Sequence, residues 1–379
     1  MKSLCFLFAI VCSIVSQIFI ALNINGGGAL KMMWLVPFCC LLLSNPKDFF
    51  YSKILNYYLF AFVFALYCLI CEVFTGVQYI GADSTNIFIS VFILSVSFSY
   101  GRQSADLEKT LKHIAVVCFA ASFIYGIVVY RHFLSGADMF STIYAYDAKN
   151  SAAQILLSSC IILFTLYKPQ KYVTKIVEYL SLTVLLLIMI LLKSRATLLG
   201  FLYVLFFFSF SYKNKKVRRL FILLGVVALL FIFSNPSIYN TVVNGILFAN
   251  RDVRDMNQLT SGRVDLMQDS ISLFLSSPLI GVGNKYFDCF PVIILTQYGI
   301  LGGLLVFAFV GKRIKECLVV LDKTNKLELC AYLLMITYLL DSLFEAQPPF
   351  GPGVKCFPLW MIWGIMLSRR SLSDRSIST

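Results

Sequence analysis

Long apolar runs alternate with short polar gaps along the chain, and this pattern predicts a bundle of membrane helices. A helix that spans a bilayer needs roughly 20 mostly apolar residues. By this criterion we expect spans at residues 4–22, 32–44, 54–75, 86–100, 114–130, 152–167, 176–193, 196–212, 220–234, 291–310, 328–344 and 355–368. The sequence therefore predicts an all-α fold, in which residues 1–379 form a single polytopic membrane domain with about twelve transmembrane helices.

Basic residues recur in every second gap between these runs. They are Lys47 and Lys53, then Arg102, Lys109 and Lys112, then Lys168, Lys171 and Lys175, and further groups between Lys213 and Arg219, Lys312 and Lys326, and Arg369 and Arg375. Cytoplasmic loops of membrane proteins carry such an excess of lysine and arginine. We therefore expect both termini in the cytoplasm and the alternate gaps on the outer side.

Composition agrees with a membrane protein and narrows its chemistry. The chain is 59% hydrophobic and 13% charged, whereas soluble domains are about a quarter charged. The net charge of +13 is concentrated in the cytoplasmic gaps, so it predicts no nucleic-acid partner. Most of the 12 cysteines lie inside apolar runs and predict no disulfide framework. With only His113 and His132 in the chain, we expect no zinc site. The function inferred below implies no metal or organic cofactor.

Residues 235–290 form the longest polar interval and are predicted to be one large outer loop. Loops that only connect helices are usually short, so we expect this loop to carry the chemistry while the helices hold a lipid substrate. Arg251 and Arg254 alternate with Asp252 and Asp255 in its middle. This stretch is either a solvated charged segment or a contact for acidic or hydroxylated sugars.

The same loop contains a predicted amphipathic helix. Val264, Met267, Ile271 and Phe274 recur at steps of three and four, which is the spacing of one helix face. Ser261 is the expected N-cap, Asp265 suits the first turn, and Pro278 ends the helix. Arg263 would then lie at a helix N-terminus, where free backbone N–H groups favour an anion; the alternative is a solvated arginine.

A second outer arginine, Arg195, lies in a tight corner between two apolar runs. It is either an interfacial residue that extends to lipid headgroups or an anion contact, because guanidinium donors match phosphate oxygens. Asp288, at the outer mouth of the tenth run, is a candidate general base or a hydrated helix-start carboxylate. His132 is a second candidate base, although interfacial histidines are common.

Other outer residues have two interpretations each. The carboxylates Glu72, Asp341 and Glu345 lie near span ends and are either functional or merely hydrated. The side chains of Tyr144, Tyr146 and Tyr239 either stack on sugar rings or are interfacial tyrosines. Glycines at 281 and 283 predict a tight turn, and Gly299 and Gly303, four residues apart, predict close helix packing.

Three segments then carry a family resemblance. They are Ser194-Arg195-Ala196 opening a run, Ser261-Gly262-Arg263 with Pro-Leu-Ile-Gly-Val-Gly at 278–283, and Gln-Tyr-Gly-Ile-Leu-Gly at 297–302; Asp147-Ala148-Lys149-Asn150 precedes them. In order, spacing and expected side of the membrane, residues 147–303 resemble the O-antigen polymerase and ligase superfamily, the Wzy/WaaL-like proteins. The likeness is strongest to a Wzy O-antigen polymerase.

The resemblance implies a metal-independent, inverting membrane glycosyltransferase of the GT-C type in the bacterial inner membrane. Its substrates would be glycans on undecaprenyl diphosphate, joined at the periplasmic face, with membrane lipids, a chain-length regulator and a flippase as partners. It implies catalytic roles for Arg195 and Arg263, on the leaving diphosphate, and Asp288 as the expected base. The implied substrate-binding residues are Asn150, His132, Tyr146, Arg251 and Arg254.

One departure separates polymerase from ligase. Ligases of the superfamily carry a His-Asn pair about eleven residues before the glycine of the tenth span, where this chain has Asp288-Cys289. The substitution favours a polymerase over the alternative of an O-antigen ligase that uses lipid A core as acceptor. A polysaccharide flippase or transporter is a competitor of another class, but the sequence shows no internal repeat. A non-enzymatic assembly protein would not need the two arginines.

Overall fold

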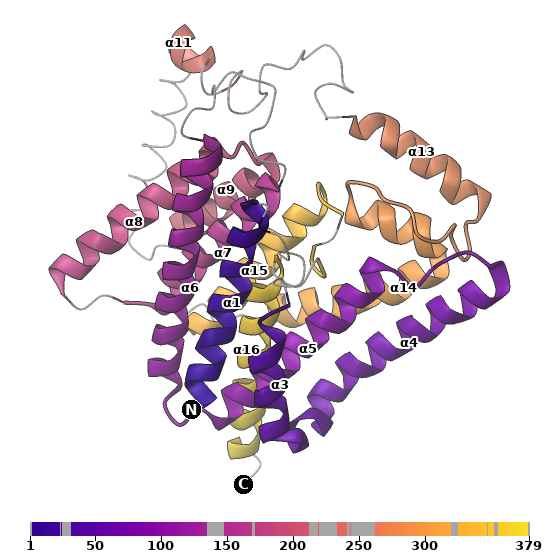
Figure 1. Cartoon of the computed structure of the whole chain (residues 1–379), viewed down its shortest axis with the longest axis horizontal. Coiled ribbons are helices and arrows are strands. Elements are labelled where there is room, and N and C mark those ends of the chain that lie inside the picture. Colours follow the sequence, from indigo (N-terminus) through magenta and orange to yellow (C-terminus); the bar gives the residue numbers. More distant parts are fainter. Residues whose placement is uncertain are drawn as a thin grey trace.

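The protein is described by a computed structural model at residues 2–22, 24, 32–134, 148–168, 171–211, 219, 233–240, 243, 262–319, 325–346, 348–351 and 355–377. These residues form helices, turns and loops without a β-strand (Figure 1). The helices are α1 (Lys2–Ala21), α3 (Leu35–Ser44), α4 (Ser52–Thr75), α5 (Ala82–Gln103), α6 (Leu107–Val129), α7 (Lys149–Leu166), α8 (Tyr172–Leu191), α9 (Arg195–Ser211), α11 (Pro236–Tyr239), α13 (Arg263–Ser276), α14 (Phe290–Val319), α15 (Lys326–Ser342) and α16 (Phe357–Ile377).

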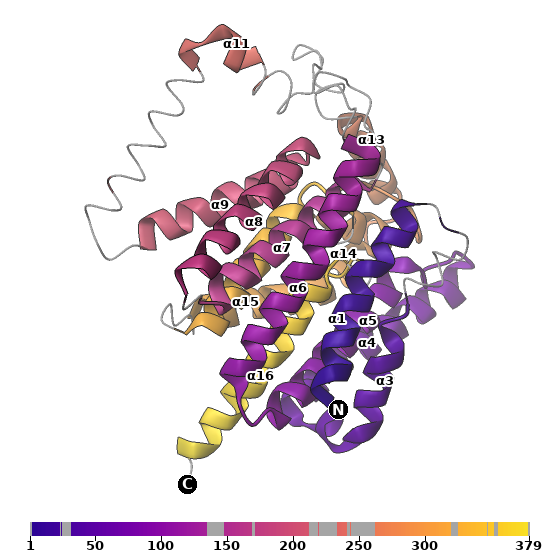
Figure 2. The same cartoon turned by 60° about the vertical axis from the view of Figure 1, so that its left-hand side comes forward.

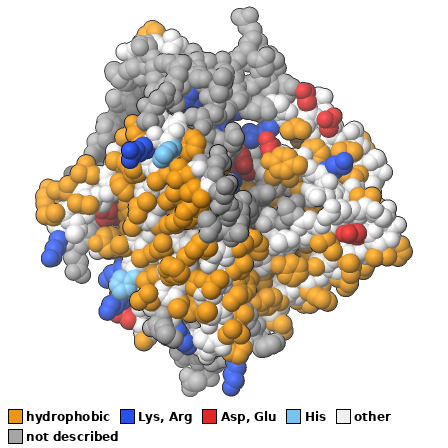
Figure 3. All heavy atoms as spheres, in the orientation of Figure 1, with side chains coloured by type: hydrophobic (Ala, Val, Ile, Leu, Met, Phe, Trp, Pro, Cys, Tyr) orange, Lys and Arg blue, Asp and Glu red, His pale blue; other side chains and the backbone are white. Residues whose placement is uncertain are grey.

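The predicted all-α membrane fold is confirmed. Every predicted run except one coincides with a helix, and the ninth, at 220–234, lies almost entirely outside the described residues. Within the described part, 7 helices are long and apolar enough to cross a membrane, and α3 and α9 are shorter apolar helices. Hydrophobic side chains cover most of the described middle of the face in Figure 3. The chain is an integral membrane protein.

The helices have two distinct ends. The start of α1 and the end of α16 lie together at one end of the molecule, and α11 and α13 lie at the opposite end (Figures 1 and 2). We call the latter the α13 end. Since α7 and α9 begin and α15 ends on the side opposite to the chain termini, their polar end residues meet there. This arrangement agrees with the alternation of basic gaps in the sequence.

The interior is built on close packing of α16 against α5. Gly364 lies so near α5 that an added Cβ would come within 2.3 Å of the Leu94 carbonyl oxygen. Trp360 and Trp363 of α16 are fully buried, and the Trp360 indole donates a hydrogen bond of 2.8 Å to the Pro349 carbonyl. This bond fixes the segment between α15 and α16, which forms part of the α13 end.

Helix α14 is broken at Gly299, where φ is +63°. The amides of Ile300 and Leu301 donate instead to the carbonyls of Pro278 (2.8 Å) and Leu279 (3.1 Å). The helix carbonyls of Thr296 and Gln297 in turn accept from the amides at 282 (2.9 Å) and 283 (3.1 Å). Residues 278–283, which lie outside the helix, therefore pair with the backbone groups that the break leaves without a partner in the helix. A buried backbone requires such pairing.

This break corrects the prediction that Gly299 and Gly303 serve close packing of a continuous helix. A Cβ on Gly299 would lie 2.4 Å from the Leu279 carbonyl, so the glycine admits the 278–283 segment. The residues nearest Gly303 belong to α14 itself, whereas Gly302 faces Tyr67 of α4, 2.6 Å from an added Cβ. The predicted turn at 281–283 is confirmed, because both glycines have positive φ.

Glu72 has a structural role in holding the loop after α4. Its carboxylate accepts hydrogen bonds from the backbone amides of Tyr79 (3.2 Å) and Ile80 (3.1 Å). The Tyr79 hydroxyl then donates 2.8 Å to the Gly281 carbonyl. Glu72 thus stabilises the loop that supports the broken region of α14, a structural role that neither interpretation of this carboxylate included.

Candidate active site

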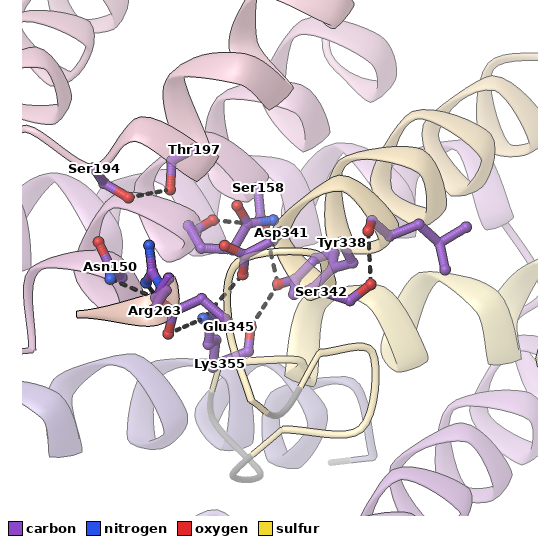
Figure 4. A network of polar contacts seen from close by, with 12 residues as sticks. Asn150, Ser158, Ser194, Thr197, Arg263, Tyr338, Asp341, Ser342, Glu345 and Lys355 are labelled. Atoms are coloured by element: carbon purple, nitrogen blue, oxygen red, sulfur yellow. Dashed lines mark hydrogen bonds and ion pairs between the residues drawn. The ribbon is translucent and has the colours of Figure 1, made fainter. Parts of the chain in front are cut away.

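Polar side chains from five parts of the chain converge at the α13 end (Figure 4). They come from the first turn of α7, the first turn of α13, the segment that leads into α14, the end of α15 and the segment that leads into α16. We call them the outer cluster, whose members are Asn150, Arg263, Asp288, Asp341, Glu345 and Lys355. The sequence places these residues up to about 200 positions apart, so only the fold brings them together.

Arg263 is the first residue of α13, as predicted, and the guanidinium reaches into the cluster. Its Nε lies 3.6 Å from Asp288 Oδ2, and its Nη2 lies 3.6 Å from Glu345 Oε1. Both distances exceed those of a charge-assisted hydrogen bond, and Nε is buried without a hydrogen-bond partner among the described residues. Arg263 is therefore held in place by charge, and its Nε–H donor has no hydrogen-bond acceptor among the described residues.

The start of α13 differs from the prediction in one detail. The residue at the N-cap is Gly262, with φ of +78°, and no side chain caps the helix there. Ser261, predicted as the cap, lies outside the described residues. Asp265 is in the first turn and the helix ends at Ser276, before Pro278, as predicted. The uncapped N-terminus leaves backbone N–H groups that favour an anion beside Arg263.

Asp288, the expected base, lies next to Arg263. Its Oδ1 accepts a hydrogen bond of 2.7 Å from the Tyr286 hydroxyl, and its side chain is 29% exposed. Asp288 is thus oriented, partly accessible and close to a cation, which are the properties a general base needs.

Glu345 is the centre of the cluster. Its Oε1 accepts 2.6 Å from the Asn150 amide, and its Oε2 lies 3.6 Å from Lys355 Nζ. Burial, with the charges of Asp341 and Asp288, raises the pKa of Glu345, while Lys355 and Arg263 lower it less. Glu345 was one of the carboxylates with two interpretations, and its position beside Arg263 favours the functional one.

Lys355 is the residue that the sequence did not reveal. Its Nζ lies 2.9 Å from Asp341 Oδ2, and both side chains are almost fully buried. The Tyr338 hydroxyl donates to the Lys355 carbonyl and accepts 3.1 Å from Ser158, which anchors the lysine to α15 and α7. Burial lowers the pKa of Lys355, but Asp341 and Glu345 together reverse this effect and raise it. The sequence offered one signal for this site, which is that Lys355 is the first residue of the predicted span 355–368.

Arg195 is the first residue of α9, and packing places it at the level of the cluster. An added Cβ on Gly200 would lie 3.3 Å from Leu157 of α7 and 3.5 Å from Thr337 of α15. Arg195 precedes Gly200 by five residues, so it lies about one and a half helical turns closer to the α13 end. At that height it is level with the start of α7 and the end of α15. Figure 4 shows Ser194 and Thr197, hydrogen-bonded at 2.9 Å, on the side of Asn150.

The remaining predicted residues are not placed in the cluster. His132 is exposed in the short π-turn Tyr130–Leu134 after α6, and its ring lies 6.4 Å from Phe133. No contact among the described residues joins His132 to the outer cluster. Tyr144, Tyr146, Arg251 and Arg254 lie outside the described residues. Their predicted contacts with sugar stay predictions.

The arrangement has the parts for displacement of an anionic leaving group. A cation at a helix N-terminus faces the solvent-accessible side, and two carboxylates lie within 3.6 Å of its nitrogens. A prepositioned cation stabilises negative charge where it develops, and a neighbouring carboxylate accepts a proton. Among the described residues, no group of three His, Cys, Asp or Glu side chains has the geometry of a metal site.

Part of the chain that carries these residues matches a known protein family. Residues 180–299 match the family model Wzy_C, which is described as O-antigen ligase. No curated protein matches the chain. The matched region runs from α8 to the break in α14 and includes Arg195, Arg263 and Asp288. This match, with the all-helical membrane fold, supports the predicted resemblance of this segment to the O-antigen polymerase and ligase superfamily.

Proposed function

We propose that this protein is an O-antigen polymerase, which joins lipid-linked oligosaccharide repeat units into a surface polysaccharide. The observation that carries the proposal is the position of Arg263 within the family-matched region. It starts a helix, it has only loose ion pairs at 3.6 Å, and it lies beside an oriented carboxylate. This is the arrangement that transfer of a sugar from a diphosphate requires.

In the proposed reaction, Arg263 and Arg195 bind the diphosphate of an undecaprenyl-diphosphate-linked donor glycan. A sugar hydroxyl of a second lipid-linked glycan attacks the anomeric carbon from the opposite face. The new glycosidic C–O bond forms as the C–O bond to the diphosphate breaks, which inverts the anomeric carbon. Asp288 takes the hydroxyl proton, and the leaving undecaprenyl diphosphate keeps the bonding electrons. The arginines lower the barrier because they stabilise charge that grows on the leaving group.

The charge balance of the outer cluster supports participation of more than one arginine. Its described members include two cations, Arg263 and Lys355, and three carboxylates, Asp288, Asp341 and Glu345. A diphosphate entering this set would meet more negative than positive charge, so Arg195 must contribute. We further propose that Arg251, Arg254, Asn150, His132 and Tyr146 contact the glycans, and that neither metal nor organic cofactor is used.

The α13 end faces the periplasm in this proposal, and the protein resides in the bacterial inner membrane. Supporting this orientation, the start of α1 and the end of α16 lie at the opposite end (Figure 1). Lys2 starts α1 and donates a hydrogen bond to Gln103, which follows Arg102, and Arg370 belongs to the last part of α16, as the positive-inside bias requires of the cytoplasmic side. Both termini would then be cytoplasmic. A flippase that delivers the lipid-linked units and a chain-length regulator are the proposed partners.

An O-antigen ligase is the nearest alternative, and it differs only in using lipid A core as acceptor. Asp288-Cys289 at the position of the ligase His-Asn pair favours the polymerase. A transporter remains the alternative of another class. The broken helix α14 and the buried pair Asp341–Lys355 are features that transporters also show, so the argument for an enzyme depends on Arg263 and its carboxylates.

Deletion of the gene and electrophoresis of lipopolysaccharide distinguish these functions. Loss of a polymerase leaves core with a single repeat unit, loss of a ligase leaves bare core, and loss of a flippase leaves bare core with no repeat units accumulated on the outer side. Complementation with Arg263→Ala and Arg195→Ala should fail, whereas Lys112→Ala, at an exposed pair with Glu108, should restore the ladder. Full ladders from both arginine variants would reject the assigned site.

A further inference from the structure

Helix α13 has a wide apolar face, one part of which packs against other described residues. Leu266 and Leu273 pack with Phe287, Ile293 and Ala346 at the α13 end. Ser270 between them is buried. This edge anchors the helix on the start of α14. The rest of the apolar face projects away from that contact.

The projecting part is a continuous stripe of large side chains. Met267, Ile271 and Leu275 follow one another at intervals of four residues, and Ile271 is 51% and Leu275 68% exposed. Val264 and Phe274 flank the stripe. At 3.6 residues per turn these five positions fall within about 100° of arc. Burying such a stripe in an apolar phase is favourable, and leaving it in water is not.

The opposite face of α13 is polar and acidic. Asp265 and Asp269 lie there with Ser272 and Ser276, and all four are exposed. A helix with one apolar and one polar face suits an interface between water and an apolar phase. The acidic side chains rule out attraction of anionic headgroups by this face, so apolar burial must supply the binding energy.

The stripe joins the surface that faces the bilayer. Beyond the end of α13, Leu279 continues the spacing of four residues and is 60% exposed. The backbone of Leu279 is hydrogen-bonded to Leu301, at 3.1 Å. Leu301 and Leu304 are exposed side chains of α14, a candidate membrane span. Leu279 therefore links the end of α13 to exposed leucines of a candidate membrane span, and this adjacency argues for lipid as the occupant of the stripe.

We propose that α13 lies in the surface of the bilayer, with its Met267–Ile271–Leu275 stripe in the acyl region and its aspartates in water. In Figure 1, α13 lies above α14 and α4 and is not parallel to α6, a candidate membrane span. A helix that lies in the bilayer surface should differ in direction from a spanning helix in this way. Arg263 lies between the protein-facing and lipid-facing edges of the helix. If the proposed function holds, the helix keeps this arginine at the depth of a lipid-borne diphosphate.

Fluorescence quenching by brominated phosphatidylcholine tests the placement in the full-length protein. The native indoles of Trp34, Trp360 and Trp363 are buried and give a constant background. The indole added in I271W should be quenched at least about twofold more than the one added in D269W, on the opposite face. Bromines near the headgroup should quench it more than bromines near the chain end.

Several outcomes would overturn the proposal. Equal quenching of I271W and D269W would place the stripe in water, and shielding of I271W together with concentration-dependent crosslinking would assign it to a second copy of the chain. If I271W does not fold, L275W makes the same comparison. Neither measurement needs enzymatic activity, so the bilayer placement and the polymerase proposal can fail independently.

Discussion

Lys355 Nζ lies 2.9 Å from Asp341 Oδ2, and the two side chains are 3% and 0% exposed. A buried ion pair of this kind offsets the large cost of removing two charges from water only while both partners are present. The pair joins the end of α15 to the segment that begins α16 and also touches Glu345 at 3.6 Å. It therefore determines where the central carboxylate of the outer cluster lies.

Replacement of Lys355 by methionine should destabilise the protein strongly. Asp341 would be left buried and unpaired, which costs about 3–5 kcal/mol. Thermal unfolding followed by size-exclusion in detergent should show a large drop in Tm, and the double variant with Asp341→Leu should recover much of it. Lys112→Met, which breaks an exposed pair with Glu108, should change stability by less than about 0.5 kcal/mol. An unchanged Tm in the single Lys355 variant would contradict this account.

Arg263→Ala should reduce polymerisation by roughly two to three decades, because one prepositioned donor to developing charge is worth several kcal/mol. Arg263→Lys should retain part of the activity, since the ammonium keeps the charge and loses the planar fork. Arg195→Ala is expected to match Arg263→Ala. The measurement is transfer between purified lipid-linked glycans, with Tm as the control for folding. Activity within about threefold of wild type in either alanine variant would count against the diphosphate site.

The sequence predicted those parts of the site that depend on local pattern. The steps between Val264, Met267, Ile271 and Phe274 located α13, so Arg263 was correctly placed at a helix start. The abrupt change from one apolar run to the next placed Arg195 at the start of α9. Both predictions needed only helix periodicity and the length of a span.

The sequence did not predict contacts that depend on tertiary packing. Apolar residues continue on both sides of Gly299, and hydropathy has no signal for a helix whose broken hydrogen bonds are completed by residues 278–283. Lys355 is adjacent to a predicted span, and only the path of the preceding segment brings it to Asp341. The bond between Asn150 and Glu345 joins helices that are distant in sequence.

Donor binding should depend on the protonation of Glu345. Burial raises the pKa of Glu345 above its usual range, so the carboxyl gains a proton at a higher pH than an ordinary glutamate. Below that pKa, Arg263 loses a competing carboxylate 3.6 Å away. The KM for the donor should therefore fall as the pH falls through it, by about fivefold if the pair is worth ~1 kcal/mol. In Glu345→Gln this pH dependence should disappear, with KM low throughout. A variant with the wild-type profile would exclude Glu345 as the titrating group.

Asp288 should act mainly on turnover. Asp288→Asn keeps the size of the side chain and its contact with Tyr286 but removes the proton acceptor, and general base catalysis typically contributes 10²–10⁴-fold. We expect kcat to fall by about two decades or more, while KM for the donor should fall as in Glu345→Gln, because Arg263 loses the Asp288 carboxylate 3.6 Å away. Tyr286→Phe, which removes only the hydroxyl that orients Asp288, should have a smaller effect. If Asp288→Asn turns over normally, another group accepts the proton.

The break in α14 gives a prediction about two glycines in one helix. At Gly299 a Cβ would lie 2.4 Å from the Leu279 carbonyl and 2.6 Å from the Gly281 amide, both rigid backbone atoms, and φ is +63°. Gly299→Ala should therefore cost about 2 kcal/mol or more. At Gly311, in the same helix, nothing lies within 4 Å of an added Cβ, so Gly311→Ala should stabilise the protein by about 0.5–1 kcal/mol. Opposite shifts in Tm are expected from the two substitutions. Equal shifts in Tm would mean that residues 278–283 do not pack into the break of α14. The C-terminal end of α13 would then have no anchor on α14.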